Sequence, residues 1–169
     1  EKIQQKCKVN YGFRPAVIQD CAHGLGSEYK GKKLGSTKHD TFTIYSFQAI
    51  KHLTTVDGGC LILPDNRYYK RAKLLRWYGI DRDDNRKDFR CENDIPEWGF
   101  KFHMNDVAAT IGLCNFEHIH KILEKHKQNA DFYDKELSDV KNVKIIKNSH
   151  KSSYWIYTIK VNNQKRFMD

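Results

Sequence analysis

The chain has 169 residues, of which 39% are hydrophobic and 12% aromatic, a composition typical of a globular domain with a real core. No run approaches the ~18 consecutive apolar residues of a membrane span, and no signal peptide opens the sequence. The net charge of +9 would suit an anionic partner, but acidic residues interrupt the basic ones. We therefore expect neither a nucleic acid nor a membrane as partner. A nucleic-acid-binding module is an alternative that rests on charge alone.

The five cysteines are widely spaced, and no CxxC motif is present. This pattern argues against a disulfide framework and against a zinc ribbon. Reduced thiols in a cytoplasmic protein are the interpretation that we adopt.

Short apolar runs separated by turn residues fill the first half of the chain. In chain order, the pattern predicts a helix over 2–9, a buried strand over 16–22, a glycine-rich loop over 23–36, strands over 40–47 and 58–64, and a helix over 66–79. Gly79 is the expected C-terminal cap of the last helix. The opening residues read as the tail of a helix already under way, so we expect the chain to be a piece of something longer.

The second half is less regular. The sequence predicts a charged loop over 80–97, one long helix over 105–137, strands over 140–146 and 152–161, and the beginning of a helix after them. This order suggests an α/β domain over 1–115, a connecting helix over 116–137, and the truncated start of a second, α+β unit over 138–169.

Two polar residues of the first half could carry chemistry, and the pattern leaves two interpretations of each. Asp20 stands near the C-terminal end of a predicted strand, where ligands bind in α/β folds, but the pattern favours an ordinary turn aspartate. Lys51 lies between an apolar run and a Gly58–Gly59 pair that could hold it rigidly as a nucleophile. Since most lysines reach into solvent, the pattern alone favours a surface lysine. The histidines show no metal-binding spacing.

Three stretches together resemble the DegT/StrS-type sugar aminotransferases. They are "DCAHGLGSEYKGKKLGSTKHDTFTIYSFQAIKHLTTVDGGCLI", "WYGIDRDDNRKDFR" and "EWGFKFHMNDVAATIGL", in the family's order. The resemblance covers essentially the whole chain. It implies an α/β fold, the three-layer large domain of the aspartate aminotransferase-like, fold-type I transferases. That domain would be partial and followed by the start of a small α+β domain. The implied cofactor is pyridoxal 5'-phosphate (PLP).

The resemblance also implies roles for single residues. Asp20 matches the aspartate that pairs with the pyridine nitrogen of PLP and keeps it protonated. His23 falls where the family has Gln or His beside the ring and its phenolic oxygen. Ser46 matches the serine that donates to the cofactor phosphate. Lys51 matches the lysine that links covalently to the cofactor and then moves the proton between substrate and cofactor carbons.

One departure concerns a contact between subunits. The family pattern "YNYRM" is here "FKFHM", and Lys101 replaces an asparagine that reaches the cofactor phosphate of the neighbouring subunit in family members. A lysine could still contact that phosphate, as a point charge. The resemblance therefore implies a homodimer in which Lys101 serves the partner's site.

The implied function is transfer of an amino group, with glutamate as the expected donor, to a nucleotide-linked keto-deoxysugar in cell-surface polysaccharide or amino-sugar biosynthesis. Two alternatives stay open. Some relatives are PLP-dependent sugar dehydratases with histidine in place of the lysine; Lys51 argues against that reaction, although His52 is adjacent. The chain could also be a catalytically inactive truncated homologue, because family members are much longer.

Overall fold

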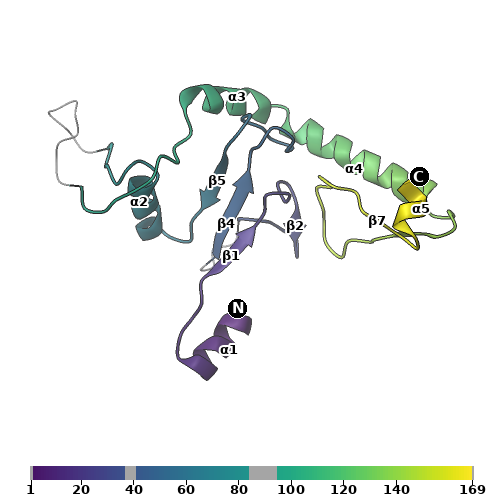
Figure 1. Ribbon diagram of the computed structural model, residues 1–169, viewed down its shortest axis with the longest axis horizontal. Coiled ribbons are helices and arrows are strands. Elements are labelled where there is room, and N and C mark those ends of the chain that lie inside the picture. The colour runs from purple at the N-terminus through teal and green to yellow at the C-terminus, as the bar shows by residue number, and fades with distance from the viewer. Residues whose placement is uncertain (1, 37–40, 84–94, 169) are drawn as a thin grey trace.

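A computed structural model describes residues 2–36, 41–83 and 95–168 (Figure 1). Its centre is a three-stranded sheet of β1 (Val17–Asp20), β4 (Thr41–Ser46) and β5 (Gly59–Ile62), in the order β1-β4-β5. β-Branched and aromatic residues dominate β4, as expected for a central strand. β1 runs parallel to β4, and β5 runs antiparallel to it. The strands predicted over 16–22, 40–47 and 58–64 are confirmed.

The two faces of the sheet differ in burial. Thr43 and Tyr45 point to one face and are 2% and 7% exposed. Ile18, Ile44 and Leu61 lie on the other face and remain exposed. Alternation of side chains along each strand produces this separation.

The glycine-rich stretch after β1 contains a small hairpin where the sequence predicts only loop. β2 (Glu28–Tyr29) pairs antiparallel with β3 (Lys32–Lys33). Lys30 and Gly31 form its two-residue turn, and both have positive φ, as type I′ turns require. The strands are too short to show any apolar alternation. The Lys30–Gly31 pair was therefore the one feature of the sequence that could have predicted the hairpin turn.

Two helices flank the sheet in sequence. α1 (Lys2–Tyr11) precedes β1 and projects away from the sheet in Figure 1. α2 (Asn66–Leu75) follows β5 and begins at Asp65, whose carboxylate accepts the Tyr68 N–H at 3.0 Å. Aspartate is a favoured N-cap for this reason.

The predicted end of the helix over 66–79 is wrong by four residues. α2 stops at Leu75 because the next residues turn to meet the chain that returns over 99–102. The Phe100 N–H donates to the Leu75 carbonyl at 2.7 Å, and the Tyr78 N–H donates to the Phe100 carbonyl at 3.0 Å. Gly79 has φ +80°, and an added Cβ would lie 1.8 Å from the Glu97 carbonyl oxygen. Gly79 thus serves this turn rather than a longer helix.

The single long helix predicted over 105–137 is in fact two helices, α3 (Asp106–Phe116) and α4 (Ile119–Glu136). Asn105 caps α3 by accepting the Ala108 N–H at 2.9 Å. At the break, the His118 N–H donates to the Asn115 carbonyl at 3.1 Å, three residues back instead of four. This tighter turn separates the helices although the backbone of both break residues stays near helical values.

The C-terminal part consists of β6 (Val143–Ile145), β7 (Ile159–Val161) and α5 (Gln164–Met168). β6 and β7 pair antiparallel and lie beyond α4, away from the main sheet (Figure 1). The strand predicted over 152–161 is therefore mostly wrong, because only its last three residues pair. Ser153 and Trp155 instead bond to the loops of the main sheet, at Ser27 and Ile50, and Tyr157 donates to Asp134 on α4.

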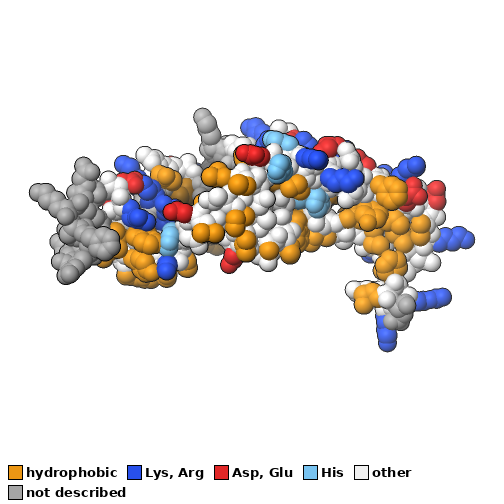
Figure 2. All heavy atoms as spheres, turned by 90° about the horizontal axis from the view of Figure 1, so that it is seen from above, with side chains coloured by type: hydrophobic (Ala, Val, Ile, Leu, Met, Phe, Trp, Pro, Cys, Tyr) orange, Lys and Arg blue, Asp and Glu red, His pale blue; other side chains and the backbone are white. Residues whose placement is uncertain are grey.

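Hydrophobic side chains gather on much of the face shown in Figure 2. The exposed apolar residues of the molecule include Val107, Leu113 and Phe116 of α3. Within the described residues, no helix is long and apolar enough to cross a membrane. The greater part of the predicted loop over 80–97 lies outside the described residues.

Candidate functional site

Asp20 and Ser46 end two neighbouring parallel strands. Asp20 is level with Ile44 in the β1–β4 register, and Ser46 follows Ile44 by two residues on the same face. The carboxyl ends of parallel strands meet at one sheet edge, which is where ligands bind in α/β folds. The structure therefore brings these two predicted site residues to one edge.

The Asp20 carboxylate is exposed at this edge. Its Oδ1 accepts the Ala22 N–H at 3.0 Å, which closes the turn after β1. The part of the chain that the structure describes offers no second donor to this carboxylate. The burial of Cys21 raises the pKa of its thiol, and the neighbouring charge of Asp20 raises it further. The adjacent thiol is thereby kept neutral while the carboxylate stays open to a ligand.

Lys51 lies in a loop over 47–58 whose ends are tied together. The Phe47 N–H donates to the Gly58 carbonyl at 2.8 Å, and the Thr55 N–H donates to the Phe47 carbonyl at 2.9 Å. Gly58 has φ +137°, a conformation that other residues rarely adopt. The glycine next to β5 thus closes the loop, as the sequence predicts, and Lys51 projects from a constrained backbone.

Helix α3 supports this loop from outside the sheet. The Asn115 side-chain amide donates to the Thr54 carbonyl at 3.0 Å. Gly112 packs so closely that an added Cβ would lie 2.6 Å from Thr55 Cγ2. The stretch "NDVAATIGLCN" therefore contacts the lysine loop in two ways. Asn115 donates a hydrogen bond to it, and Gly112 allows close packing because it has no side chain.

Lys51 and His23 meet at a residue that the sequence analysis missed, Trp155. Lys51 Nζ lies 4.0 Å from the centroid of the indole ring, and the His23 imidazole stacks on the indole at 3.9 Å with an interplanar angle of 24°. The indole Nε1–H donates to the Ile50 carbonyl at 2.8 Å. The sequence predicts a strand at Trp155 and gives this segment no role in the site. The presence of a tryptophan there was the one feature that could have drawn attention to it.

His52, next to Lys51, is buried and held neutral. Burial, and to a smaller extent the nearby His126, lower the pKa of His52 to about 4, although a hydrogen bond with the Ser153 backbone acts in the opposite direction. The rings of His52 and His126 meet edge to face with centroids 4.4 Å apart. His52 therefore adds no positive charge beside Lys51 at neutral pH.

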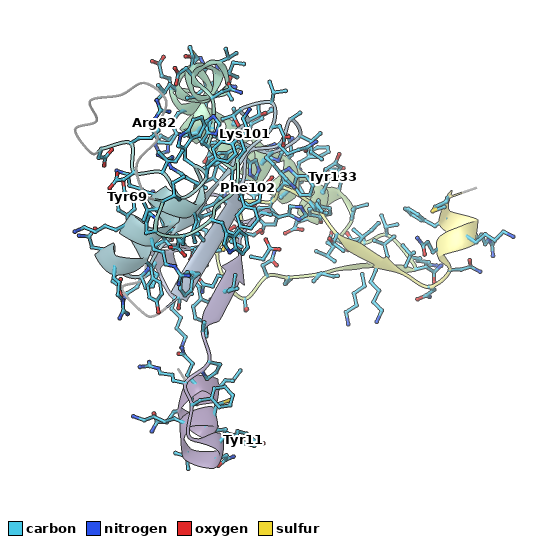
Figure 3. The ribbon with its side chains drawn as sticks, turned by 60° about the vertical axis from the view of Figure 1, so that its left-hand side comes forward. Tyr11, Tyr69, Arg82, Lys101, Phe102 and Tyr133 are labelled. Atoms are coloured by element: carbon cyan, nitrogen blue, oxygen red, sulfur yellow. The ribbon has the colours of Figure 1, made fainter. Side chains whose placement is uncertain are left out.

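Lys101 is in a different neighbourhood. It forms an isolated bridge with Trp77, whose ring also lies 4.9 Å from the Arg82 guanidinium. Figure 3 shows Lys101 and Arg82 in the region above α2. Lys101 thus lies beside residues that follow α2, and not in the loops that carry Asp20 and Lys51. This position is compatible with the predicted contact of Lys101 with the cofactor phosphate of another subunit.

The chemical groups at the sheet edge are of the types that would bind the ring, the phosphate and the aldehyde of PLP. An open carboxylate suits a pyridinium N–H, a hydroxyl suits a phosphate oxygen, and a constrained primary amine suits an aldehyde. These are Asp20, Ser46 and Lys51, and His23 lies next to Lys51 across the indole. Among the described residues, no group of three or more potential ligands could hold a metal ion.

Comparisons with known proteins agree with this arrangement. Residues 6–169 match the profile of the DegT/DnrJ/EryC1/StrS aminotransferase family. The UDP-4-amino-4,6-dideoxy-N-acetyl-beta-L-altrosamine transaminase of Campylobacter jejuni subsp. jejuni serotype O:23/36 is 36% identical over 146 residues. That match covers 85% of this chain and 37% of the transaminase, so the chain spans well under half of this relative's length.

Solved structures support the same assignment. AtS13 from Actinomadura melliaura superposes with a TM-score of 0.90 at 44% identity, covering 99% of this chain and 44% of AtS13. Spr1654 from Streptococcus pneumoniae, solved in its PLP form, gives a TM-score of 0.74 at 28% identity, covering 92% of this chain and 39% of Spr1654. The expected fold-type I fold is confirmed. The chain belongs to the DegT/DnrJ/EryC1/StrS aminotransferase family, which includes PLP-dependent sugar aminotransferases.

Proposed function

We propose that this chain carries one wall of the active site of an aminotransferase that aminates a nucleotide-linked keto-deoxysugar, with glutamate as the amino donor. The observation that supports the proposal most strongly is the parallel register of β1 and β4, which puts Asp20 and Ser46 at the sheet edge where the Lys51 loop begins. The Campylobacter relative acts on a UDP-linked 4-amino-4,6-dideoxysugar, so a UDP-linked 4-keto-6-deoxysugar is the substrate class to test.

Each residue of this wall has a distinct task. The Asp20 carboxylate would accept the ring N–H of PLP and would favour the protonated form of that nitrogen. The Ser46 hydroxyl would donate to the cofactor phosphate, and His23 would lie beside the ring. When bound, PLP supplies an electron sink that stabilises negative charge on the carbon exchanging its amino group. Lys51 Nζ would hold the cofactor covalently at rest and, once released, would serve as the group that accepts and donates the proton.

We also propose that the protein works as a homodimer in the cytoplasm, with Lys101 contacting the partner's cofactor phosphate. In this proposal residues 1–115 belong to the PLP-binding large domain and residues 116–137 connect it to the start of the small domain over 138–169. The close contact of Gly112 with Thr55 supports the assignment of α3 to the large domain. Amino-sugar synthesis for cell-surface polysaccharide is the corresponding biological setting.

The direct test is product analysis. The protein is purified as the cell makes it and incubated with PLP, glutamate and a UDP-linked 4-keto-6-deoxysugar. We expect a UDP-amino sugar and an equal amount of 2-oxoglutarate by mass spectrometry, and neither product with the Lys51→Ala variant. Consumption of the keto sugar without an amino sugar, in the presence of glutamate, would exclude the transaminase and favour the dehydratase alternative.

A further inference from the structure

We propose that Trp155 is a positioning residue for Lys51, an inference that rests on the proposed function. Its indole faces the reactive amine, since Lys51 Nζ lies 4.0 Å from the ring centroid. The same indole stacks on His23 at 3.9 Å. One side chain from the C-terminal part of the chain thus contacts two predicted cofactor-binding residues that are 28 positions apart in sequence.

The indole is fixed relative to the lysine backbone. Its Nε1–H donates to the carbonyl of Ile50, the residue immediately before Lys51, at 2.8 Å. The ring therefore keeps its position if the lysine loop shifts as a unit. A lysine side chain has four rotatable bonds, and an aromatic face that attracts its ammonium group restricts where Nζ can be.

The segment that carries Trp155 is anchored to the same region of the fold. Ser153 is 5% exposed, and its N–H donates to Ser27 Oγ at 3.0 Å. The Tyr154 carbonyl lies 3.1 Å from His126 Nδ1 on α4, and Tyr154 itself has φ +51°. These contacts hold residues 153–155 in a turn instead of the strand that their composition favours.

A purely structural tryptophan would not need this placement. Trp155 is only partly buried, and its ring contacts a charged amine and an imidazole rather than a continuous apolar core. An indole face that contacts a cationic group is typical of sites in which an aromatic ring binds that group. From this placement we infer that the Trp155 ring orients Lys51 Nζ.

The test compares three variants of the protein purified as the cell makes it. Trp155→Leu removes the ring face, and Trp155→Phe keeps a ring face but loses the Nε1 donor. Phe132→Leu, at an exposed position of α4, is the matched control for loss of an aromatic ring. Circular dichroism and thermal melting identify any variant that fails to fold; if Trp155→Leu fails, Trp155→Met, which also lacks a ring face, takes its place in the comparison with Trp155→Phe and Phe132→Leu.

The first measurement needs no cofactor. Lysines are acetylated for short times, and the label at Lys51 is measured by mass spectrometry against the label at Lys127, which pairs with Asp131 on α4. Loss of the indole should raise the rate of Lys51 labelling by about threefold, as expected for a weak cation–π contact, without changing Lys127. General loosening of the fold would raise both rates.

The second measurement is the rate at which borohydride-trapped PLP appears on Lys51. We expect this rate to fall by about threefold or more in Trp155→Leu, and Trp155→Phe to restore most of it. Labelling and trapping rates that match those of Phe132→Leu in both Trp155 variants would overturn the inference. If even the unmodified protein traps no PLP, the proposed function fails, while the labelling result still decides whether Trp155 positions the amine.

Discussion

At the scale of single residues, the neighbourhood of Lys51 is polar yet carries little extra charge. His52 is 6% exposed, and its Nε2 has no hydrogen-bond partner among the described residues. Burial is the main cause of its lowered pKa, and the edge-to-face contact with His126 adds to it. A neutral His52 therefore adds no positive charge next to the Lys51 amine in sequence.

This burial predicts a pH dependence of stability. The unfolded chain protonates His52 near pH 6.5, whereas the folded chain does so only near pH 4. Between these values the unfolded state binds more protons, so the free energy of unfolding should decrease as the pH falls from 6.5 to 4. Urea unfolding of the protein across this range should show the decrease, and His52→Asn should flatten it.

The matched control for this prediction is His120→Gln, because His120 is exposed on α4. That variant should keep the full dependence on pH. An equal slope in the unmodified protein and in His52→Asn would show that His52 does not titrate differently in the folded and unfolded states.

At the scale of elements, the fit between α3 and the lysine loop is tight enough to test with one methyl group. Alanine at Gly112 would normally stabilise a helix interior by up to about 1 kcal/mol. Here the new Cβ would lie 2.6 Å from Thr55 Cγ2, and Thr55 is 4% exposed. We expect Gly112→Ala instead to lower the free energy of unfolding by about 1–3 kcal/mol, as overpacking does.

The control removes the opposing methyl group. Thr55→Ser deletes Cγ2 but keeps the hydroxyl that donates to the Asp57 carbonyl at 2.7 Å. The double variant should regain most of the stability lost by Gly112→Ala, and urea unfolding of all four proteins gives the coupling. Additive losses in the two single variants would mean that Gly112 and Thr55 do not contact each other as described.

The elements also show what sequence patterns could and could not predict. The β1, β4 and β5 strands and the Asp20, Ser46 and Lys51 positions were accessible, because apolar runs, glycines and family motifs coincide there. The break before Ile119 and the irregular course around Trp155 were not. The course around Trp155 depends on tertiary contacts, such as the bonds of Ser153 to Ser27, that leave local propensity unchanged. The break is a single tight turn in which the His118 N–H bonds to the Asn115 carbonyl, and no capping or glycine residue marks it in the sequence.

At the scale of the whole molecule, the proposed site is shared between subunits. Lys101 adjoins Trp77 rather than the Lys51 loop, so its predicted phosphate contact would be made in the partner's site. Loss of one hydrogen bond to a charged group costs about 1.5–3 kcal/mol. Lys101→Ala should therefore weaken PLP binding by roughly 10- to 100-fold, measured by fluorescence titration.

Mixed dimers test whether Lys101 acts across the interface. A dimer of one Lys51→Ala chain and one Lys101→Ala chain contains one site with both changes and one site with neither. We expect that dimer to bind one PLP with unmodified affinity and to recover half of the activity of the unmodified protein. If Lys101 served its own subunit, every site of the mixed dimer would carry one change, and no high-affinity site would appear.

The central claim is that Lys51 is the residue that binds PLP covalently, and borohydride trapping tests it most directly. The purified protein is incubated with PLP, reduced, digested and mapped by mass spectrometry. We expect one pyridoxyl group on the peptide that contains Lys51, and no such group in Lys51→Ala. Modification of other lysines without Lys51, or no modification of the unmodified protein at all, would contradict it.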